Sequence, residues 1–361
     1  MSSFQSEFAF SQPAVRVRFA PGIRHETGSE VARLGGKRAA ILSTPGKSGM
    51  AEALASDMGG RVAGLVPLAE MHTPVAVTEQ ALGEVKRLGA DCLVAIGGGS
   101  TIGLGKALAF RTGLPQIALP TTYAGSEATP VLGQTEGGKK TTTTDPRVQP
   151  QVILYDAELV RSLPVPITVA SALNAMAHAA EGLYARDRNP VATLLAVEGL
   201  GAFRDALPVV CETPGDLEAR GETLYGSWLC GTVLGQVGMS LHHKLCHVLG
   251  GAFDLPHAET HAVMLPHTIA FNAGAAGPLL DPLREIFGSN DIGQGLAAFS
   301  DKVGAPRALR DLGLREADLK RAADLAMEAS YWNPRPLVRD EILELLVAAW
   351  AGNPRRAGDA H

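Results

Sequence analysis

The chain of 361 residues is 46% hydrophobic and carries 37 acidic and 32 basic residues, which give a formal net charge of −5. Because one hydrophobic core rarely serves so long a chain, these values favour two domains. The lack of a lysine- or arginine-rich run argues against nucleic acid or an anionic membrane as a partner, so we expect a small soluble partner. No stretch reaches the roughly 20 apolar residues that span a bilayer.

In the first half of the chain, short β-rich runs alternate with helical periodicity. The strand-like runs are residues 14–19, 38–43, 62–67, 92–97, 116–120 and 151–156, and the helical patterns are residues 48–58, 77–89 and 101–113. Continuously apolar strands that alternate with helices are typical of βαβ units and of a mostly parallel sheet. Residues 130–145 hold a Gly-Gly pair between polar β-formers and predict a hairpin.

From about Pro164 the strand-like runs fade and long Ala- and Leu-rich helical patterns replace them. These patterns cover residues 166–186, 191–207, 222–236, 292–304, 315–330 and 339–352. We therefore predict an α/β domain over residues 1–163, with a mostly parallel sheet, and an all-helical domain over residues 164–361.

Cysteine usage indicates a reducing compartment. The four cysteines are scattered, without CxxC pairs or the spacing of a disulfide framework: Cys92, Cys211, Cys230 and Cys246. Each is interpreted as a small buried hydrophobe. The first residues also lack the basic-then-apolar order of a signal peptide, so we expect a cytoplasmic protein.

A glycine-rich turn in "AIGGGSTIGLGKALA" lies between a predicted strand and a predicted helix. Gly97, Gly98 and Gly99 let the backbone approach an anion, and the N–H groups that start the helix, with Ser100, favour a diphosphate. A dinucleotide is the natural ligand, although such turns also occur for packing alone, and the usual fingerprint follows the first strand of a sheet rather than a later one.

A second polar turn, "LPTTYAGSEATP", follows the next strand. Because neighbouring parallel strands end at the same edge of a sheet, Thr121, Thr122 and Ser126 are expected to line the same crevice as the glycine-rich turn. Each hydroxyl taken singly could simply cap its turn. Two such turns on successive strands favour the interpretation that they bind a ligand.

Histidines gather in "HHKLCHVLGGAFDLPHAETH", residues 242–261. On a helix, His243 and His247 share one face, and His257 follows a Gly-rich bend and a proline. Farther upstream, Asn174 and His178 also share a helical face. Asn174, His178, His243 and His257 together have the form of a carboxylate-plus-three-histidine metal site in which an amide replaces the carboxylate.

In order and spacing, "GGGSTIGLGKA", "PTTYAGSEATP", "NAMAHAAEGLYA" and residues 242–267 resemble the iron-containing alcohol dehydrogenase superfamily, and within it the maleylacetate reductase branch. The resemblance covers nearly the whole chain. It implies the dehydroquinate synthase-like fold, with a dinucleotide-binding α/β domain, a helical catalytic domain, an active site in the cleft between them, and commonly a homodimer.

The resemblance also bears on the metal. Metal-dependent members hold iron or zinc with an Asp and three His, whereas this chain has Asn174 at the position of the Asp. A neutral amide donates less charge than a carboxylate, so we expect no metal, as in the maleylacetate reductases, which are similarly thought to work without one. A zinc site with three His and a water is the open alternative.

For the cofactor, the resemblance implies NADH or NADPH. Members selective for NAD often carry an Asp after the second strand, where this chain has Thr44 with Lys47 nearby, so NADPH is expected to be accepted as well. Lys140, in the predicted hairpin, completes the cofactor-binding candidates.

The implied reaction is reduction of the carbon–carbon double bond of maleylacetate to 3-oxoadipate, in the catabolism of aromatic compounds. Hydride delivery β to the ketone leaves an enolate, which an imidazole can stabilise and then protonate. We expect His243, with His178 or His257, to stabilise the enolate, His247 to assist proton delivery, and Asn174 to orient His178. The candidates for binding the substrate carboxylates are Lys244 and Arg335, each of which could also be a surface charge.

Three other histidines, His242, His261 and His267, are interpreted as ordinary core or surface residues. Two alternative functions remain: a metal-dependent alcohol or glycerol-type dehydrogenase of the same superfamily, and a non-catalytic nucleotide-binding protein. Tight stoichiometric metal would favour the first, and a lack of any NADH-dependent turnover would favour the second.

Overall fold

The computed structural model describes residues 5, 7–137, 139–328 and 330–353, and its contacts divide the chain into two compact units. An α/β unit holds residues 12–163 and 215–224. A helical unit holds residues 164–214, the described residues from Tyr225 onward and the described residues before Gln12. The main division thus lies between Leu163 and Pro164, while residues 215–224 return to the α/β unit.

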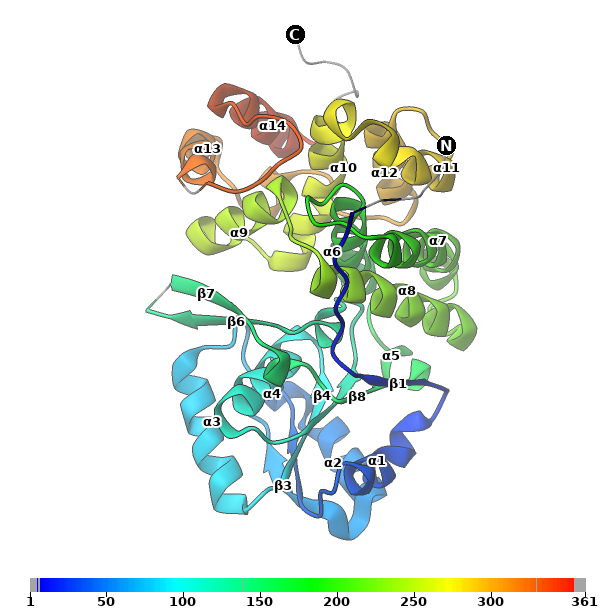
Figure 1. The fold of residues 1–361 in the computed structure, drawn as a ribbon, viewed down its shortest axis with the longest axis vertical. Coiled ribbons are helices and arrows are strands. Elements are labelled where there is room, and N and C mark those ends of the chain that lie inside the picture. Colours follow the sequence, from blue (N-terminus) through cyan, green and yellow to red (C-terminus); the bar gives the residue numbers. More distant parts are fainter. Residues whose placement is uncertain (1–4, 6, 138, 329, 354–361) are drawn as a thin grey trace. The chain divides into compact units, whose positions relative to one another are not determined.

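The α/β unit is built on a parallel six-stranded sheet in the order β1-β8-β5-β4-β2-β3 (Figure 1). Its strands are β1 Arg16–Phe19, β2 Ala39–Leu42, β3 Val62–Val66, β4 Cys92–Gly97, β5 Gln116–Pro120 and β8 Val152–Tyr155. The central strands are buried along their whole length, as their continuous apolar runs predicted. The predicted parallel sheet is confirmed.

The helices of this unit are α1 Thr27–Arg33, α2 Ser48–Met58, α3 Val75–Leu88, α4 Gly99–Thr112 and α5 Ala157–Val160. Side chains of α1 and α2, including Val31 and Leu54, pack with Val94 and Ile117 into one core. The predicted hairpin is present as β6 Val131–Glu136 and β7 Lys139–Thr144, which pair antiparallel.

The helical unit contains α6 Val165–Gly182, α7 Pro190–Glu212, α9 Leu241–Phe253, α10 His257–Ala276, α11 Asp281–Phe287, α12 Ile292–Lys302, α13 Leu319–Met327 and α14 Arg339–Ala351. Helix α8, Leu217–Gln236, begins in the segment that belongs to the α/β unit and ends in the helical unit. Helix α6 is buried over most of its length and packs against α7 and α10. Leucines of α9, α13 and α14 form a second core.

Two details of the histidine-rich stretch differ from expectation. Gly250 and Gly251 do not form a bend, because α9 continues through both to Phe253. The chain turns instead at Asp254, which has a left-handed φ of 55°, and α10 begins directly at His257.

Within the described ranges, none of the helices has the length and apolar character that a membrane span requires.

Candidate functional site

The glycine-rich turn and the second polar turn lie side by side at one edge of the sheet. Gly97, at the end of β4, pairs with Pro120, at the end of β5, and the Thr121 N–H donates to the Gly97 carbonyl at 3.0 Å. A Cβ atom at Gly98 would stand only 2.9 Å from Cγ2 of Thr122, so the close approach of the two turns requires glycine.

Helix α4 begins two residues earlier than predicted, which places Gly99 and Ser100 in its first turn. N–H groups of a first helical turn have no carbonyl partner within the helix, so they can bind an anion such as a diphosphate. Both residues are at least partly accessible. The structure therefore brings together the predicted cofactor-binding residues Gly97, Gly98, Gly99, Ser100, Thr121 and Thr122.

A buried lysine that the sequence did not single out fixes the far end of the second turn. Nζ of Lys106, on α4, donates to the carbonyls of Ser126, Thr129 and Val131 at 2.5, 2.7 and 2.9 Å, and to Oγ1 of Thr129 at 2.8 Å. Burial lowers the pKa of Lys106 to about 7, a shift that the charge of Glu127 opposes. Ser126 is thus held by its backbone, while its buried Oγ has no hydrogen-bond partner among the described residues.

The other two cofactor candidates are placed less completely. β2 and β4 pair in register up to Leu42 and Ala95, so Thr44 emerges at the same sheet edge as Gly97. Thr44 is partly buried and precedes a short 3-10 helix, Pro45–Lys47. Lys140 belongs to β7, but its side chain lies outside the described part of the chain.

In the helical unit, α6, α9 and α10 bring the predicted catalytic histidines into one cluster. His178 Nδ1 lies 2.8 Å from His243 Nε2, and both residues are buried. The ring of His247 lies 6.3 Å from that of His243 and 6.4 Å from that of His257. Asn174 is buried one helical turn before His178, and its Oδ1 has no hydrogen-bond partner among the described residues.

Glu181 lies beneath this cluster, and the sequence analysis missed it. Its fully buried carboxylate accepts hydrogen bonds from Ser240 Oγ at 2.7 Å, the His242 N–H at 2.8 Å and His243 Nδ1 at 2.6 Å. Burial raises the pKa of Glu181, but the hydrogen bond and charge of His243, with smaller contributions from His242 and Ser240, outweigh burial and lower it to about 2. Glu181 therefore stays ionised and fixes the orientation of His243.

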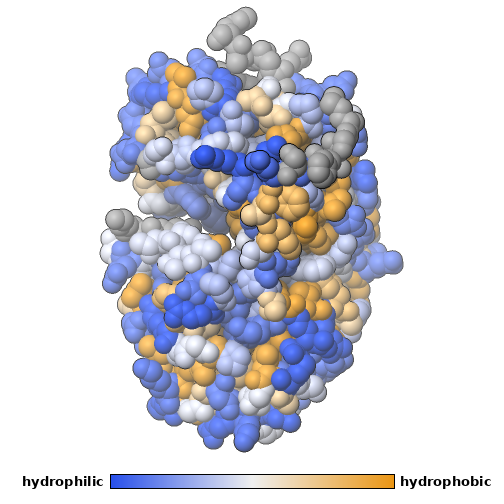
Figure 2. Space-filling model, in the orientation of Figure 1, coloured by the Kyte–Doolittle hydropathy of each residue, from blue (hydrophilic) through white to orange (hydrophobic). Residues whose placement is uncertain are grey.

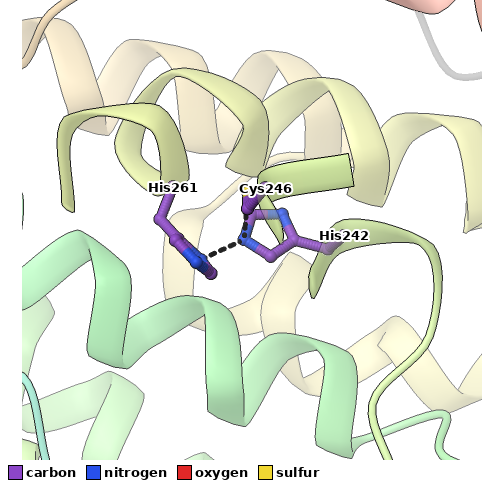
Figure 3. A group of neighbouring side chains, drawn as sticks. All are labelled: His242, Cys246 and His261. Carbon is purple, nitrogen blue, oxygen red and sulfur yellow. Dashed lines mark hydrogen bonds between the residues drawn. The ribbon is translucent and has the colours of Figure 1, made fainter. Parts of the chain in front are cut away.

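Two histidines interpreted as ordinary core or surface residues belong to the cluster. His242 and His261 are both fully buried, with His242 Nε2 2.9 Å from His261 Nδ1 (Figure 3). The His261 ring lies 4.5 Å from that of His257 and 5.0 Å from that of His243. His267 is also buried, farther along α10. His242 and His261 are thus core residues, as interpreted, and their rings lie against those of the predicted catalytic histidines His243 and His257.

The predicted donor set does not fit a metal as it stands. Asn174, His178, His243 and His257 offer four neutral donors, and the 2.8 Å between His178 Nδ1 and His243 Nε2 is that of a hydrogen bond. Two nitrogens on one tetrahedral zinc, each about 2.0–2.1 Å from the ion, would stand roughly 3.3 Å apart.

A second group, His242, Cys246 and His261, has its donor atoms within 4.8 Å of one another (Figure 3). His242 and His261 already bond to each other, and burial raises the pKa of the Cys246 thiol well above its usual 9.0, which opposes the thiolate that a metal needs. These three side chains are therefore better described as a hydrogen-bonded group.

The two cationic residues predicted to bind the substrate carboxylates, Lys244 and Arg335, contact other groups of the protein. The Lys244 ammonium lies 5.9 Å from the Tyr331 ring centroid and is partly buried. The Arg335 guanidinium pairs with Glu341 at 2.7 Å, donates to the Phe271 carbonyl at 3.1 Å and stacks on the Phe271 ring. Arg335 is thus held largely by its own unit, and the substrate roles of both residues remain predictions.

Residues 14–157 match the family described as iron-containing alcohol dehydrogenase, and residues 168–350 match the C-terminal part of the Fe-containing alcohol dehydrogenase family. The maleylacetate reductase of Rhizobium sp. strain MTP-10005 is 54% identical over 96% of this chain and 98% of its own length. That of Burkholderia cepacia is 49% identical over 96% and 98%. The crystal structure of maleylacetate reductase from Agrobacterium tumefaciens has a TM-score of 0.95 at 54% identity and covers 97% of this chain and 100% of its own.

Proposed function

The chain belongs to the iron-containing alcohol dehydrogenase family, and from that premise we propose that it is a maleylacetate reductase that uses NADH or NADPH to reduce the carbon–carbon double bond of maleylacetate to 3-oxoadipate. In this proposal the enzyme is cytoplasmic, in keeping with its four free cysteines, and forms a homodimer, as the family resemblance implies. The α/β unit binds the dinucleotide, and the helical unit supplies the acid–base groups.

The observation that carries the proposal is the chain of contacts from Glu181 through His243 to His178. The ionised carboxylate can only accept, so His243 Nδ1 bears a proton, and a second proton is held between His243 Nε2 and His178 Nδ1. The nicotinamide, when bound, supplies the hydride. Negative charge then grows on the former ketone oxygen, and an imidazole pair over a buried carboxylate can donate to it.

Other residues have supporting roles in the proposal. Transfer of a proton to the α-carbon completes the reduction, and the exposed His247 is the residue proposed to assist it. Lys244 and Arg335 are proposed to bind the two substrate carboxylates, and Asn174 to orient His178. The neutral Thr44 at the sheet edge supports use of both NADH and NADPH, because no carboxylate there would repel a 2′-phosphate.

We further propose that the reaction needs no metal. The test is NADH consumption with maleylacetate as oxidant, using protein treated exhaustively with a strong chelator. Rapid oxidation is the expected result. If activity is lost and returns only with zinc or iron, the histidines are ligands and the enzyme is metal-dependent. If neither NADH nor NADPH is consumed, with or without metal, maleylacetate is not the substrate.

Replacement of His243 tests the acid–base role of the His178–His243 pair. His243→Gln should lower kcat by about 10²-fold or more, the usual contribution of a general acid, while the Kd for NADH changes little. The control is His25→Gln, since His25 is exposed in the α/β unit. A His243→Gln enzyme with wild-type kcat would refute the assignment.

A further inference from the structure

His261 occupies the middle of the histidine cluster. The rings of His257, His242, His243 and His178 lie 4.5, 4.9, 5.0 and 6.3 Å from its own. Its Nδ1 faces His242, and its Nε2, on another edge of the ring, is buried without a hydrogen-bond partner among the described residues. A buried polar atom without a partner is costly, so its protonation state calls for an explanation.

Hydrogen bonds join Thr268, His242 and His261 in a row, and the positions of the protons along it follow from the Thr268 hydroxyl at one end. Its hydroxyl lies 2.9 Å from the Met264 carbonyl, which can only accept, and 2.8 Å from His242 Nδ1. When the hydroxyl donates to the carbonyl, as threonines in helices commonly do, its oxygen accepts from His242 Nδ1. His242 Nε2 is then bare and accepts from His261 Nδ1 at 2.9 Å. His261 Nε2 is left as a bare lone pair.

The opposite arrangement, in which each hydrogen bond of the row has its donor and acceptor exchanged, is less favourable. It would put a proton on His261 Nε2 and so leave an N–H group buried without an acceptor, which is rarer in proteins than an under-used acceptor. The Cys246 thiol, 3.8 Å from His242 Nε2, also suits a bare nitrogen at that position. Burial lowers the pKa of His242 to about 3 and that of His261 well below 6.5, so both rings stay neutral.

We propose that Thr268, His242 and His261 form a fixed hydrogen-bond relay that holds His261 neutral with a bare Nε2, and that His261 thereby acts as a positioning residue for the donor imidazoles of His243 and His257. The functional part of this inference rests on the proposed reductase activity. Through the relay, the cluster is divided into a pair that shares a mobile proton, His178 and His243, and a pair with fixed protons, His242 and His261. A neutral acceptor beside the mobile pair favours a protonated donor imidazole, whereas a charged ring would oppose it.

Thr268 offers matched variants, because valine keeps its shape and serine keeps its hydroxyl. Thr268→Val should lower kcat by about tenfold, as loss of a group that orients a functional histidine commonly does, with the KM for NADH unchanged. Thr268→Ser should retain kcat within about threefold, although it loses the methyl group. Equal kcat values for the two variants, both folded by circular dichroism, would overturn the positioning role.

The relay itself is tested without activity. In protein with ¹⁵N-labelled histidine rings, NMR spectra should show His261 protonated at Nδ1 and bare at Nε2, assigned by loss of its signals in His261→Asn. A proton at Nε2 of His261 in the wild type would overturn the relay. This readout stands even if maleylacetate proves not to be the substrate, so failure of the relay and failure of the proposed function are distinguishable.

Discussion

Among single residues, Glu181 connects α6 to the histidine-rich start of α9. Its carboxylate is fully buried, yet it is ionised because it accepts hydrogen bonds from Ser240, the His242 backbone and His243. A buried negative charge of this kind stabilises a positive charge on the His178–His243 pair above it. Glu181 thus fixes the His243 ring through Nδ1 and leaves Nε2 to share a proton with His178.

Glu181→Gln tests this arrangement by removing the charge while keeping the shape. Loss of the buried carboxylate, which accepts hydrogen bonds from Ser240 and His243, should lower the free energy of unfolding at pH 7 by about 3 kcal/mol. The pKa of Glu181 is about 2 in the folded chain, below its ordinary value of 4.5, so this stabilisation is present above pH 4.5 and is lost as the pH falls toward 2. Urea unfolding at pH 7 and at pH 3 measures the difference.

The variant and wild type should therefore differ less at pH 3 than at pH 7. Glu52→Gln is the control, because Glu52 is exposed on α2. An equal gap between Glu181→Gln and wild type at the two pH values would contradict the ionised state of Glu181.

The sequence allowed prediction of the histidines but not of the carboxylate or the relay. His178, His243 and His257 were predicted through motif spacing, and α6, α9 and α10 bring them together. Glu181 was overlooked because a glutamate in a helix usually lies at the surface. The available signal was its position three residues after His178, on the same helical face. The contact of His242 with His261 depends on how α9 packs on α10, which no local pattern reveals.

Among the elements, α4 has two roles in the α/β unit. Its first turn carries Gly99 and Ser100. Its interior carries Lys106, whose ammonium donates to two carbonyls of the second polar turn and to the Val131 carbonyl at the start of β6. One helix thus provides the proposed diphosphate site and also holds the neighbouring turn in place.

Lys106→Met should disconnect the turn from the helix while conserving side-chain length. We expect the KM for NADH to rise about tenfold, because the turn loses the hydrogen bonds that hold its conformation. Hydrogen bonds from a charged group each stabilise a fold by about 1.5–3 kcal/mol. Steady-state kinetics with NADH as the varied substrate measures the change. Lys86→Met is the control, because Lys86 is exposed on α3. A KM equal to that of the control would mean that the turn keeps its shape without Lys106.

Element boundaries were predictable where local signals were strong. The sequence pattern placed α2 at its observed bounds and the start and end of α3 within two residues, because glycines punctuate the chain there. Helix α10 was missed because Pro266 interrupts its pattern. The insertion of β8 between β1 and β5 depends on pairing across more than a hundred residues and leaves no local trace.

In the molecule as a whole, the two units are not continuous in sequence. The start of α8 belongs to the α/β unit, where Arg220 is fully buried. Its guanidinium donates to the Tyr123 hydroxyl at 3.2 Å and to the Leu163 carbonyl at 2.8 Å. Tyr123 lies in the second polar turn between Thr122 and Ser126, so a residue nearly a hundred positions later supports the proposed cofactor site.

Arg220→Leu tests this support. Removal of a buried charged donor leaves the Tyr123 hydroxyl and the Leu163 carbonyl without that partner, and we expect a loss of about 3 kcal/mol in the free energy of unfolding. The KM for NADH should rise as well, because Tyr123 loses a restraint. Urea unfolding and NADH kinetics measure the two effects. Arg161→Leu, at an exposed position close in sequence to Leu163, should change neither. If Arg220→Leu weakens stability but leaves the KM unchanged, the segment supports the unit and not the turn.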